Sequence, residues 1–168
     1  MAENFKEAKQ EMSDGHQVVF NFHVHHLDGK LLWQTVKDYD TDCRALPTSW
    51  LFEMHLQQVP INGNVSIPVT LKRNDTANRP VNAYVTIGFT DPNCSSFFDD
   101  VISFGRRYVK PGEEIQENIV LYIRLPEKRK LFNEDLLVTV AIRIRSCHSG
   151  SISNPLSPDK KRKLCSMM

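Results

Sequence analysis

Three histidines close together are the residues of this chain whose type and spacing best suit chemistry. His23, His25 and His26 stand in a segment where apolar residues alternate. Side chains alternate along a strand, so histidines at i and i+2 share a face and can share a metal ion. Cys43 or His55 could approach them as a further ligand. Neither stands at a compatible spacing, so we predict exposed strand histidines and no metal site.

The cysteines do not indicate a metal or a disulfide framework. The chain has four, Cys43, Cys94, Cys147 and Cys165, widely scattered and without a C-x-x-C pair. Its first residues carry charges of both signs where a signal peptide needs an apolar core, which predicts a cytosolic or nuclear protein. In such a reducing compartment four free thiols are the prediction, in place of disulfides or a structural zinc.

Catalytic patterns are also missing. The sequence has no G-x-S-x-G, no H-E-x-x-H, and no cysteine, histidine and asparagine set that the sequence itself identifies. Asp99 and Asp100, like Glu113 and Glu114, are adjacent, so in an extended chain they point opposite ways and cannot act as an acid and base pair. We predict no catalytic residue, no cofactor and a protein that is not an enzyme.

The elements that must position these residues read as strands. From Leu136 to Ile144 every second residue is apolar, which predicts a long strand with one face in a core. The same alternation recurs at positions 18–24, 50–56, 65–71, 81–89 and 119–125, with turn residues such as Asp28-Gly29 and Asn62-Gly63 between the segments. Seven to eight short strands with almost no helical period predict an all-β, antiparallel β-sandwich.

Two segments depart from this alternation. Phe5, Ala8 and Met12 have nearly helical spacing, so residues 1–15 are predicted as a short amphipathic helix or a frayed arm. The apolar residues from Phe97 to Phe104 predict an irregular segment or single helical turn that plugs the sandwich, with Phe97 or Phe98 in the core and the other left open.

Length and charge limit the classes of protein that this chain can be. Its 168 residues suit one domain, predicted over 16–146 and followed by a flexible basic tail over 147–168. With 21 basic and 20 acidic residues the net charge gives no reason to expect nucleic acid or membrane. No apolar run approaches the roughly 20 residues of a membrane span. The tail's Lys160, Lys161, Arg162 and Lys163 predict a nuclear import signal, hence nucleus or cytoplasm.

The strand-like segments also have the spacing of a known family. They are Phe22 to Leu27, Trp50 to Met54, Val65 to Leu71, Val81 to Ile87, Ile119 to Leu125 and Leu131 to Val138. In this order they resemble the meprin and TRAF homology (MATH) domain, over roughly three quarters of the chain. The resemblance implies a TRAF-like sandwich that holds an extended segment of a partner on one sheet, as in ubiquitin ligase or signalling adaptors.

The resemblance also points to a partner surface. The chain departs from the speckle-type POZ adaptors there, because positions that are aromatic in their groove are Pro68, Ala83, Glu113 and Ile115 here. We predict that these four and Tyr84 contact a protein partner, with a different sequence preference. The chain contains no BTB domain, RING or long coiled coil, which leaves two readings: a fragment, or a solitary MATH-like protein that bridges others.

An alternative hypothesis is a nuclear, RNA-associated accessory protein. Lys128 to Lys130, Arg143 and Arg145 would form a basic edge next to the basic tail. Binding to single-stranded RNA calls for exposed aromatic side chains among the basic ones, and no such interleaving is visible in the sequence. Peptide binding that survives high salt would favour the first hypothesis, and RNA binding that collapses with salt the second.

Overall fold

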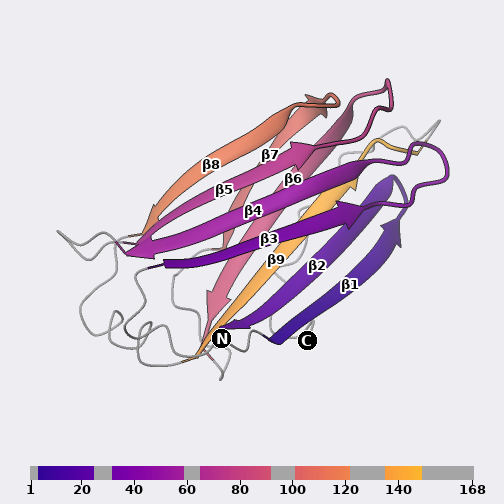
Figure 1. Cartoon of the computed structure of the whole chain (residues 1–168). Coiled ribbons are helices and arrows are strands. Elements are labelled where there is room, and N and C mark those ends of the chain that lie inside the picture. Colours follow the sequence, from indigo (N-terminus) through magenta and orange to yellow (C-terminus); the bar gives the residue numbers. More distant parts are fainter. Residues whose placement is uncertain (1–3, 25–31, 59–64, 92–100, 122–134, 149–168) are drawn as a thin grey trace.

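Two antiparallel sheets stacked face to face make up the structure, a computed structural model that describes residues 4–24, 32–58, 65–91, 101–121 and 135–148 (Figure 1). These residues contain nine strands, one more than the upper predicted number, and no helix, which confirms the predicted all-β, antiparallel sandwich. Within them there is accordingly no helix of the length and apolarity that a bilayer span requires. The narrower MATH or TRAF-like assignment stays a prediction.

The long strand predicted from Leu136 onward lies at the centre of the larger sheet. The five-stranded sheet has the order β1-β2-β9-β6-β7, and the four-stranded sheet the order β3-β4-β5-β8. The strands are β1 Asn4–Met12, β2 Gly15–Val24, β3 Leu32–Asp40, β4 Ser49–Gln58, β5 Val65–Arg73, β6 Val81–Thr90, β7 Ile102–Val109, β8 Glu114–Leu121 and β9 Leu136–Arg145. β9 pairs with β2 along its whole length and with β6 from Leu137 to Arg145.

The core lies between the two sheets and consists of the apolar side chains that alternate along the strands. Every second residue of β9 and of β4 is almost fully buried, so the two inner faces meet in one apolar layer. From β9 these residues are Leu136, Val138, Val140, Ile142 and Ile144, and from β4 they are Trp50, Phe52, Met54 and Leu56. The alternating pattern therefore predicted correctly which side of each strand faces the core.

The N-terminal segment is a strand, so the predicted helix or frayed arm is wrong. β1 pairs with β2 from Asn4 to Met12, and the ring of Phe5 lies 5.4 Å from the ring of Phe22. Pairing wins because β2 would otherwise leave a row of backbone groups without partners at its edge. The helical preference of a nine-residue segment is small compared with the hydrogen bonds that it gains by pairing with β2.

Charged side chains cover the side of the sandwich where β1 and β3 form the two edges. Lys9 Nζ lies 3.7 Å from a carboxylate oxygen of Asp42, and Lys37 Nζ stands 3.9 Å from the centre of the Phe5 ring. Lys9 Nζ also lies 5.9 Å from the centre of the Tyr39 ring, so both ammonium groups stand near aromatic rings at the margin of the core. Charges of this kind discourage a chain without complementary charges from adding to these edges.

The apolar stretch before Gly105 is a strand as well. Ile102 and Phe104 are half-buried and pack against the core from β7, while Val101 remains 50% exposed. The expected irregular plug is therefore wrong for the described part of this segment, and Phe97 and Phe98 lie outside the described residues. Pairing with β6 is shifted between Val81 and Ala83, and this irregularity obscures the period of two.

Pro68 does not mark an edge strand. β5 lies between β4 and β8, so of the two alternatives for this proline the edge position is wrong. The ladder between β4 and β5 pairs Met54 with Val69 and Gln57 with Ser66 and records no pair between these two positions. The gap falls opposite the residue that has no N–H to donate, which is where a proline is tolerated inside a sheet.

A buried ion pair holds one end of the sandwich together. The side chain of Arg73, which is 0% exposed, donates to both carboxylate oxygens of Asp75 at 2.9 Å. It also donates to the carbonyl oxygens of Arg79 at 2.9 Å and of Val109 at 2.7 Å. These bonds connect β5, the 74–80 loop and the end of β7, so one side chain joins both sheets.

Acid is expected to weaken this end of the sandwich. Burial by itself raises the pKa of Asp75, but hydrogen bonds from Arg73 and from the N–H groups of Ser49 and Ala77 outweigh it, so the pKa is lowered overall. The stabilisation is therefore complete above the ordinary aspartate pKa of about 4 and is lost as pH falls through the folded-state value. Urea unfolding at decreasing pH should show a smaller loss below about pH 4 in Asp75→Asn than in the wild type. If the exposed control Asp38→Asn flattens the profile equally, the explanation is wrong.

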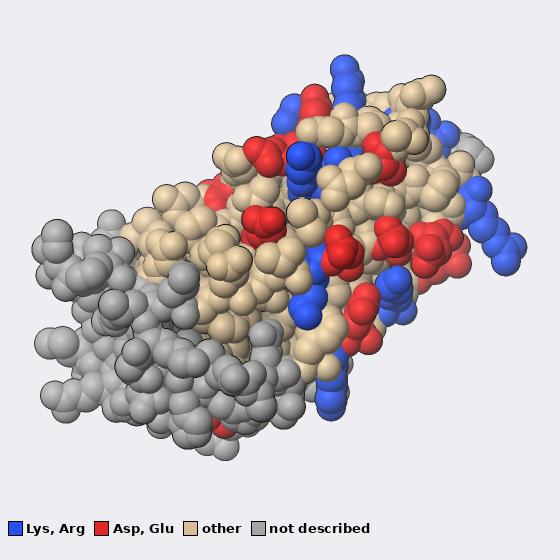
Figure 2. All heavy atoms as spheres, viewed as in Figure 1, with Lys and Arg blue, Asp and Glu red and all other residues tan. Residues whose placement is uncertain are grey.

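The face seen in Figure 2 mixes charges of both signs. Lys and Arg side chains lie among Asp and Glu side chains over the four-stranded sheet, with no field of one sign. Outward residues of these strands include Asp38, Glu53, Lys72 and Glu114. This distribution agrees with the near-neutral net charge, and it gives no electrostatic reason to expect a polyanion on this face.

Candidate functional site

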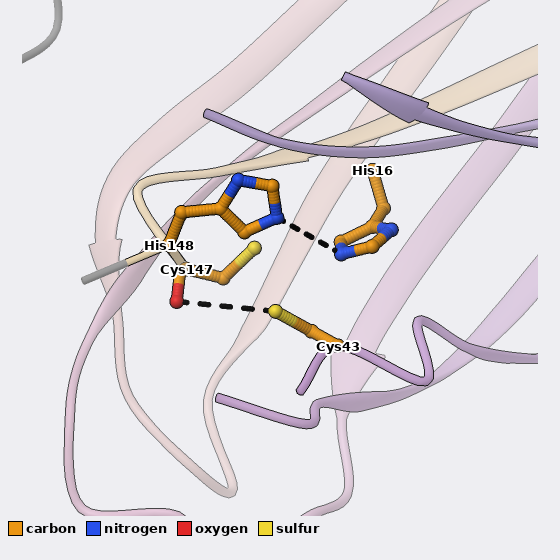
Figure 3. Close-up of side chains that lie close together, drawn as sticks. All are labelled: His16, Cys43, Cys147 and His148. Atoms are coloured by element: carbon orange, nitrogen blue, oxygen red, sulfur yellow. Dashed lines mark hydrogen bonds between the residues drawn. The ribbon is translucent and has the colours of Figure 1, made fainter. Parts of the chain in front are cut away.

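Four side chains that commonly bind metals meet at one end of the sandwich. They are His16 at the start of β2, Cys43 in the loop between β3 and β4, and Cys147 and His148 just after β9. One ligand atom from each lies within 4.8 Å of all the others. Figure 3 shows the two sulfur atoms and the facing imidazole nitrogens directed into one common space. We call these residues the Cys2His2 cluster.

Strand pairing brings three of the four residues together. Gly15 pairs with Arg145, which sets His16 beside the end of β9. The backbones approach so closely that a Cβ on Gly15 would overlap the carbonyl oxygen of Ile144, so only glycine fits. Ser146 then takes a left-handed conformation (φ 65°) and donates its N–H to the carbonyl oxygen of Asp14 at 2.9 Å. This turn places Cys147 and His148 against the beginning of β2.

Cys43 reaches the cluster from the other sheet on a well-fixed loop. Thr41 N–H donates to the carbonyl oxygen of Thr48 at 3.0 Å, and Thr48 N–H donates to Thr41 Oγ1 at 3.1 Å. The indole N–H of Trp50 donates to Thr48 Oγ1 at 2.9 Å. These bonds close the 41–48 loop over the core, and they leave Cys43 only 4% exposed. Its Sγ points at the carbonyl oxygen of Cys147, 4.0 Å away.

The imidazole rings of His16 and His148 face each other with their Nε2 atoms. His148 Nε2 lies 3.2 Å from His16 Nε2, and the two rings are nearly perpendicular. On the other side of its ring, His148 Nδ1 lies 3.0 Å from the carbonyl oxygen of Ser13, to which it can only donate. That bond assigns the proton of His148 to Nδ1 and directs the lone pair of Nε2 into the cluster.

Burial favours the neutral forms of two residues of the cluster, His16 and Cys147. It lowers the pKa of His16, and the nearby His148 lowers it further, which together outweigh the acidic neighbours Glu11 and Asp42. Burial also raises the pKa of Cys147 to about 12, with a further contribution from Cys43. A neutral imidazole is the form that binds metals, whereas a thiol must first lose its proton.

A buried carboxylate stands next to the cluster without full compensation. Asp14 is 9% exposed, and its Oδ1 has no hydrogen-bond partner among the described residues. The carboxylate is close enough to raise the pKa of Cys147. A buried carboxylate oxygen of this kind is costly unless a donor or a cation compensates it.

Of the candidate ligands that the structure describes, only Cys43 belongs to the cluster. His23 Nε2 lies 3.0 Å from a carboxylate oxygen of Asp135, and His55 sits on the outer side of β4. His25 and His26 lie outside the described residues. The signal that sequence reasoning missed is the adjacent pair Cys147-His148, which directly follows the strand that pairs with the start of β2.

The predicted partner residues do not form one surface. Pro68 lies on the outer side of the four-stranded sheet, Tyr84 on the outer side of the five-stranded sheet, and Glu113 in the turn before β8. Ala83 and Ile115 are core residues, 0% and 7% exposed, which corrects their assignment to an exposed surface. They face inward because neighbours along a strand point to opposite sides.

The predicted tail begins too early. Cys147 is 0% exposed and His148 is partly buried, so the folded domain extends at least two residues beyond the expected end at 146. The import signal of Lys160, Lys161, Arg162 and Lys163 lies outside the described residues, as does the basic run from Lys128 to Lys130.

Neither a scan of protein-family models nor a search of the curated proteins finds a match to this chain.

Proposed function

We propose that this chain is a non-enzymatic protein-interaction module that takes an extended, acidic segment of a partner as an additional strand along β7. β-Strand addition needs an exposed sheet edge, where main-chain groups supply affinity and neighbouring side chains supply selectivity. The observation that carries the proposal is the edge strand β7, whose second-to-last residue is a highly exposed tyrosine.

β7 has the properties of a docking edge. It is the outermost strand next to β6, and only its last residue, Val109, is buried. Val101, just before the strand, is 50% exposed, and Ile102 and Phe104 are half-buried. An added strand would cover these apolar side chains while pairing with the outer backbone groups of β7.

Tyr108 is a strong candidate for an anchor. It is 69% exposed and has a left-handed backbone (φ 58°), which is uncommon for a residue other than glycine. The side-chain oxygen of Asn82 holds this conformation by accepting the N–H of Tyr108 at 3.0 Å. Burial of the ring does not offset the cost of this conformation, because the ring is exposed, and exposed aromatic rings are frequent anchors at interfaces.

Charge indicates the chemistry of the partner. Arg106 and Arg107 are exposed next to Tyr108 on β7. Arg106 lies 3.6 Å from Glu113, but the two side chains are 51% and 35% exposed, so their pair is weak and a partner carboxylate can replace it. We therefore expect a partner segment with acidic residues beside an apolar one.

The proposal is tested by selecting binders from a displayed peptide library and measuring their affinity for variants. Tyr108→Asn keeps a residue that tolerates the left-handed backbone, so the chain should stay as stable while affinity falls at least about tenfold. Val36→Asn, on the outer side of the other sheet, is the matched control and should bind as the wild type does. Equal affinity in all three proteins would overturn the proposal.

A second pair of variants tests the charge preference. Arg106→Glu/Arg107→Glu should abolish binding of the acidic peptides, whereas Lys6→Glu/Lys72→Glu makes the same change in net charge away from β7 and should leave most of the affinity. Equal losses in both variants would mean that net charge acts at long range, without a site on β7.

A further inference from the structure

We propose that His16, Cys43, Cys147 and His148 bind one Zn²⁺ ion in a tetrahedral site that joins the two sheets. Two thiolates and two imidazoles form a ligand set typical of structural zinc. The ligands come from three segments that are far apart in the sequence, so the fold assembles the site.

Distances support a tetrahedral arrangement. Zinc bound to two imidazoles at its usual bond lengths holds their nitrogens about 3.3 Å apart, and His16 Nε2 and His148 Nε2 are 3.2 Å apart. Two sulfur ligands are held about 3.8 Å apart, compared with an upper limit of 4.8 Å between any two ligand atoms of the cluster. Small side-chain movements are enough to reach the bonded distances.

Protons balance on binding. Cys43 and Cys147 each lose a thiol proton to the buffer, and both histidines bind as neutral imidazoles through Nε2. His148 already carries its proton on Nδ1, whereas the proton of His16, whose Nε2 faces the Nε2 lone pair of His148, moves to Nδ1 when the ion binds. The doubly charged ion and two thiolates then sum to zero, which suits a site where Cys43 and Cys147 are 4% and 0% exposed. The Ser13 carbonyl oxygen already holds His148 in the required tautomer, at 3.0 Å from Nδ1.

Full ligation by the protein makes the role structural. All four positions of a tetrahedral ion would be filled, leaving none for water or substrate. The ion would connect the 41–48 loop, which belongs to the four-stranded sheet, with β2 and the end of β9 in the other sheet. Asp14, whose buried Oδ1 has no hydrogen-bond partner among the described residues, stands two positions before the ligand His16 and adds one negative charge beside the neutral complex.

The test uses the full chain with Cys94→Ser and Cys165→Ser, so that only the two cysteines of the cluster remain. After treatment with a chelator, the protein is titrated with Zn²⁺ against a chromophoric competitor, and with Co²⁺ to follow its visible spectrum. We expect one Zn²⁺ per chain, a tetrahedral cobalt spectrum with thiolate ligation, and a higher melting temperature with zinc.

Single variants separate the site from adventitious binding. Cys43→Ser and His148→Gln should each lower zinc affinity at least about tenfold, as loss of a ligand or of its support does. His55→Gln, on the outer side of β4, should not change it. Circular dichroism of the metal-free variants checks that they fold.

Three outcomes would overturn the assignment. One is the absence of zinc binding by the folded background protein. Another is equal zinc affinity in Cys43→Ser and the background protein. The last is recovery of the chain as a Cys43–Cys147 disulfide, two hydrogens lighter and without affinity for zinc. Loss of peptide binding along β7 would leave the zinc result unchanged, so the two proposals fail separately.

Discussion

Replacing Arg73 with alanine is expected to destabilise the chain by about 3 to 5 kcal/mol, the cost of removing one partner from a buried ion pair. Asp75, only 10% exposed, would lose both hydrogen bonds from the guanidinium. The carbonyl oxygens of Arg79 and Val109 would lose a donor as well. The loss is large because the groups left behind stay buried, where water cannot replace the missing partner.

Urea unfolding followed by circular dichroism measures this loss. The matched control is Lys9→Ala, which breaks the exposed pair with Asp42 and should cost less than about 1 kcal/mol. Asp75→Ala and the double variant complete a cycle. If the pair is coupled as described, the double variant loses clearly less than the sum of the two single losses. Additive losses, or a loss below 1 kcal/mol for Arg73→Ala, would contradict the expected role.

Replacing Trp50 with alanine is expected to cost about 3 to 5 kcal/mol, a value typical of large aromatic side chains removed from a core. Trp50 is 1% exposed and is among the largest fully buried side chains of the described residues. Its removal leaves a cavity between the sheets, and it also removes the donor that fixes Thr48 at the end of the 41–48 loop. Both effects act at the end of the sandwich that carries Cys43.

Trp50→Phe separates the two effects. It keeps a six-membered ring in the core and removes the N–H that donates to Thr48 together with part of the five-membered ring, so a loss of about 1 to 2 kcal/mol is expected from the hydrogen bond, with a smaller packing loss than in Trp50→Ala. The measurement is again the free energy of unfolding, made with the chelator-treated protein so that metal binding does not contribute. Equal losses for Trp50→Ala and Trp50→Phe would mean that the hydrogen bond, and not the packing, dominates.

Alternation of apolar residues was enough to predict the class of fold. The segments that begin at Val18, Trp50, Val65 and Val81, and the long strand from Leu136, all lie in strands with the expected residues buried. This pattern is reliable because a strand that is buried on one face must alternate, whatever its neighbours are. The same alternation, applied to the strand from Val81, puts Ala83 in the core, where the structure has it, and not at a partner surface.

Local spacing was insufficient where pairing decides the structure. Residues Asn4 to Met12 have near-helical spacing, but they form a strand because β2 offers an edge that needs a partner. Residues Ile102 to Val109 contain a pairing irregularity that breaks the period, although the segment is a strand along β6. In both cases the deciding interaction is a ladder with a segment elsewhere in the chain.

The sequence by itself determined the two inner faces and hence the sandwich, because period-two burial is a property of each segment alone. Only the tertiary structure decided which chemistry could occur, since His16, Cys43 and the pair Cys147-His148 are separated by 27 and 104 positions and meet through strand pairing and one loop. It also decided that the tyrosine at the end of β7 faces solvent. Neither result can be read from spacing, because each depends on contacts between distant segments.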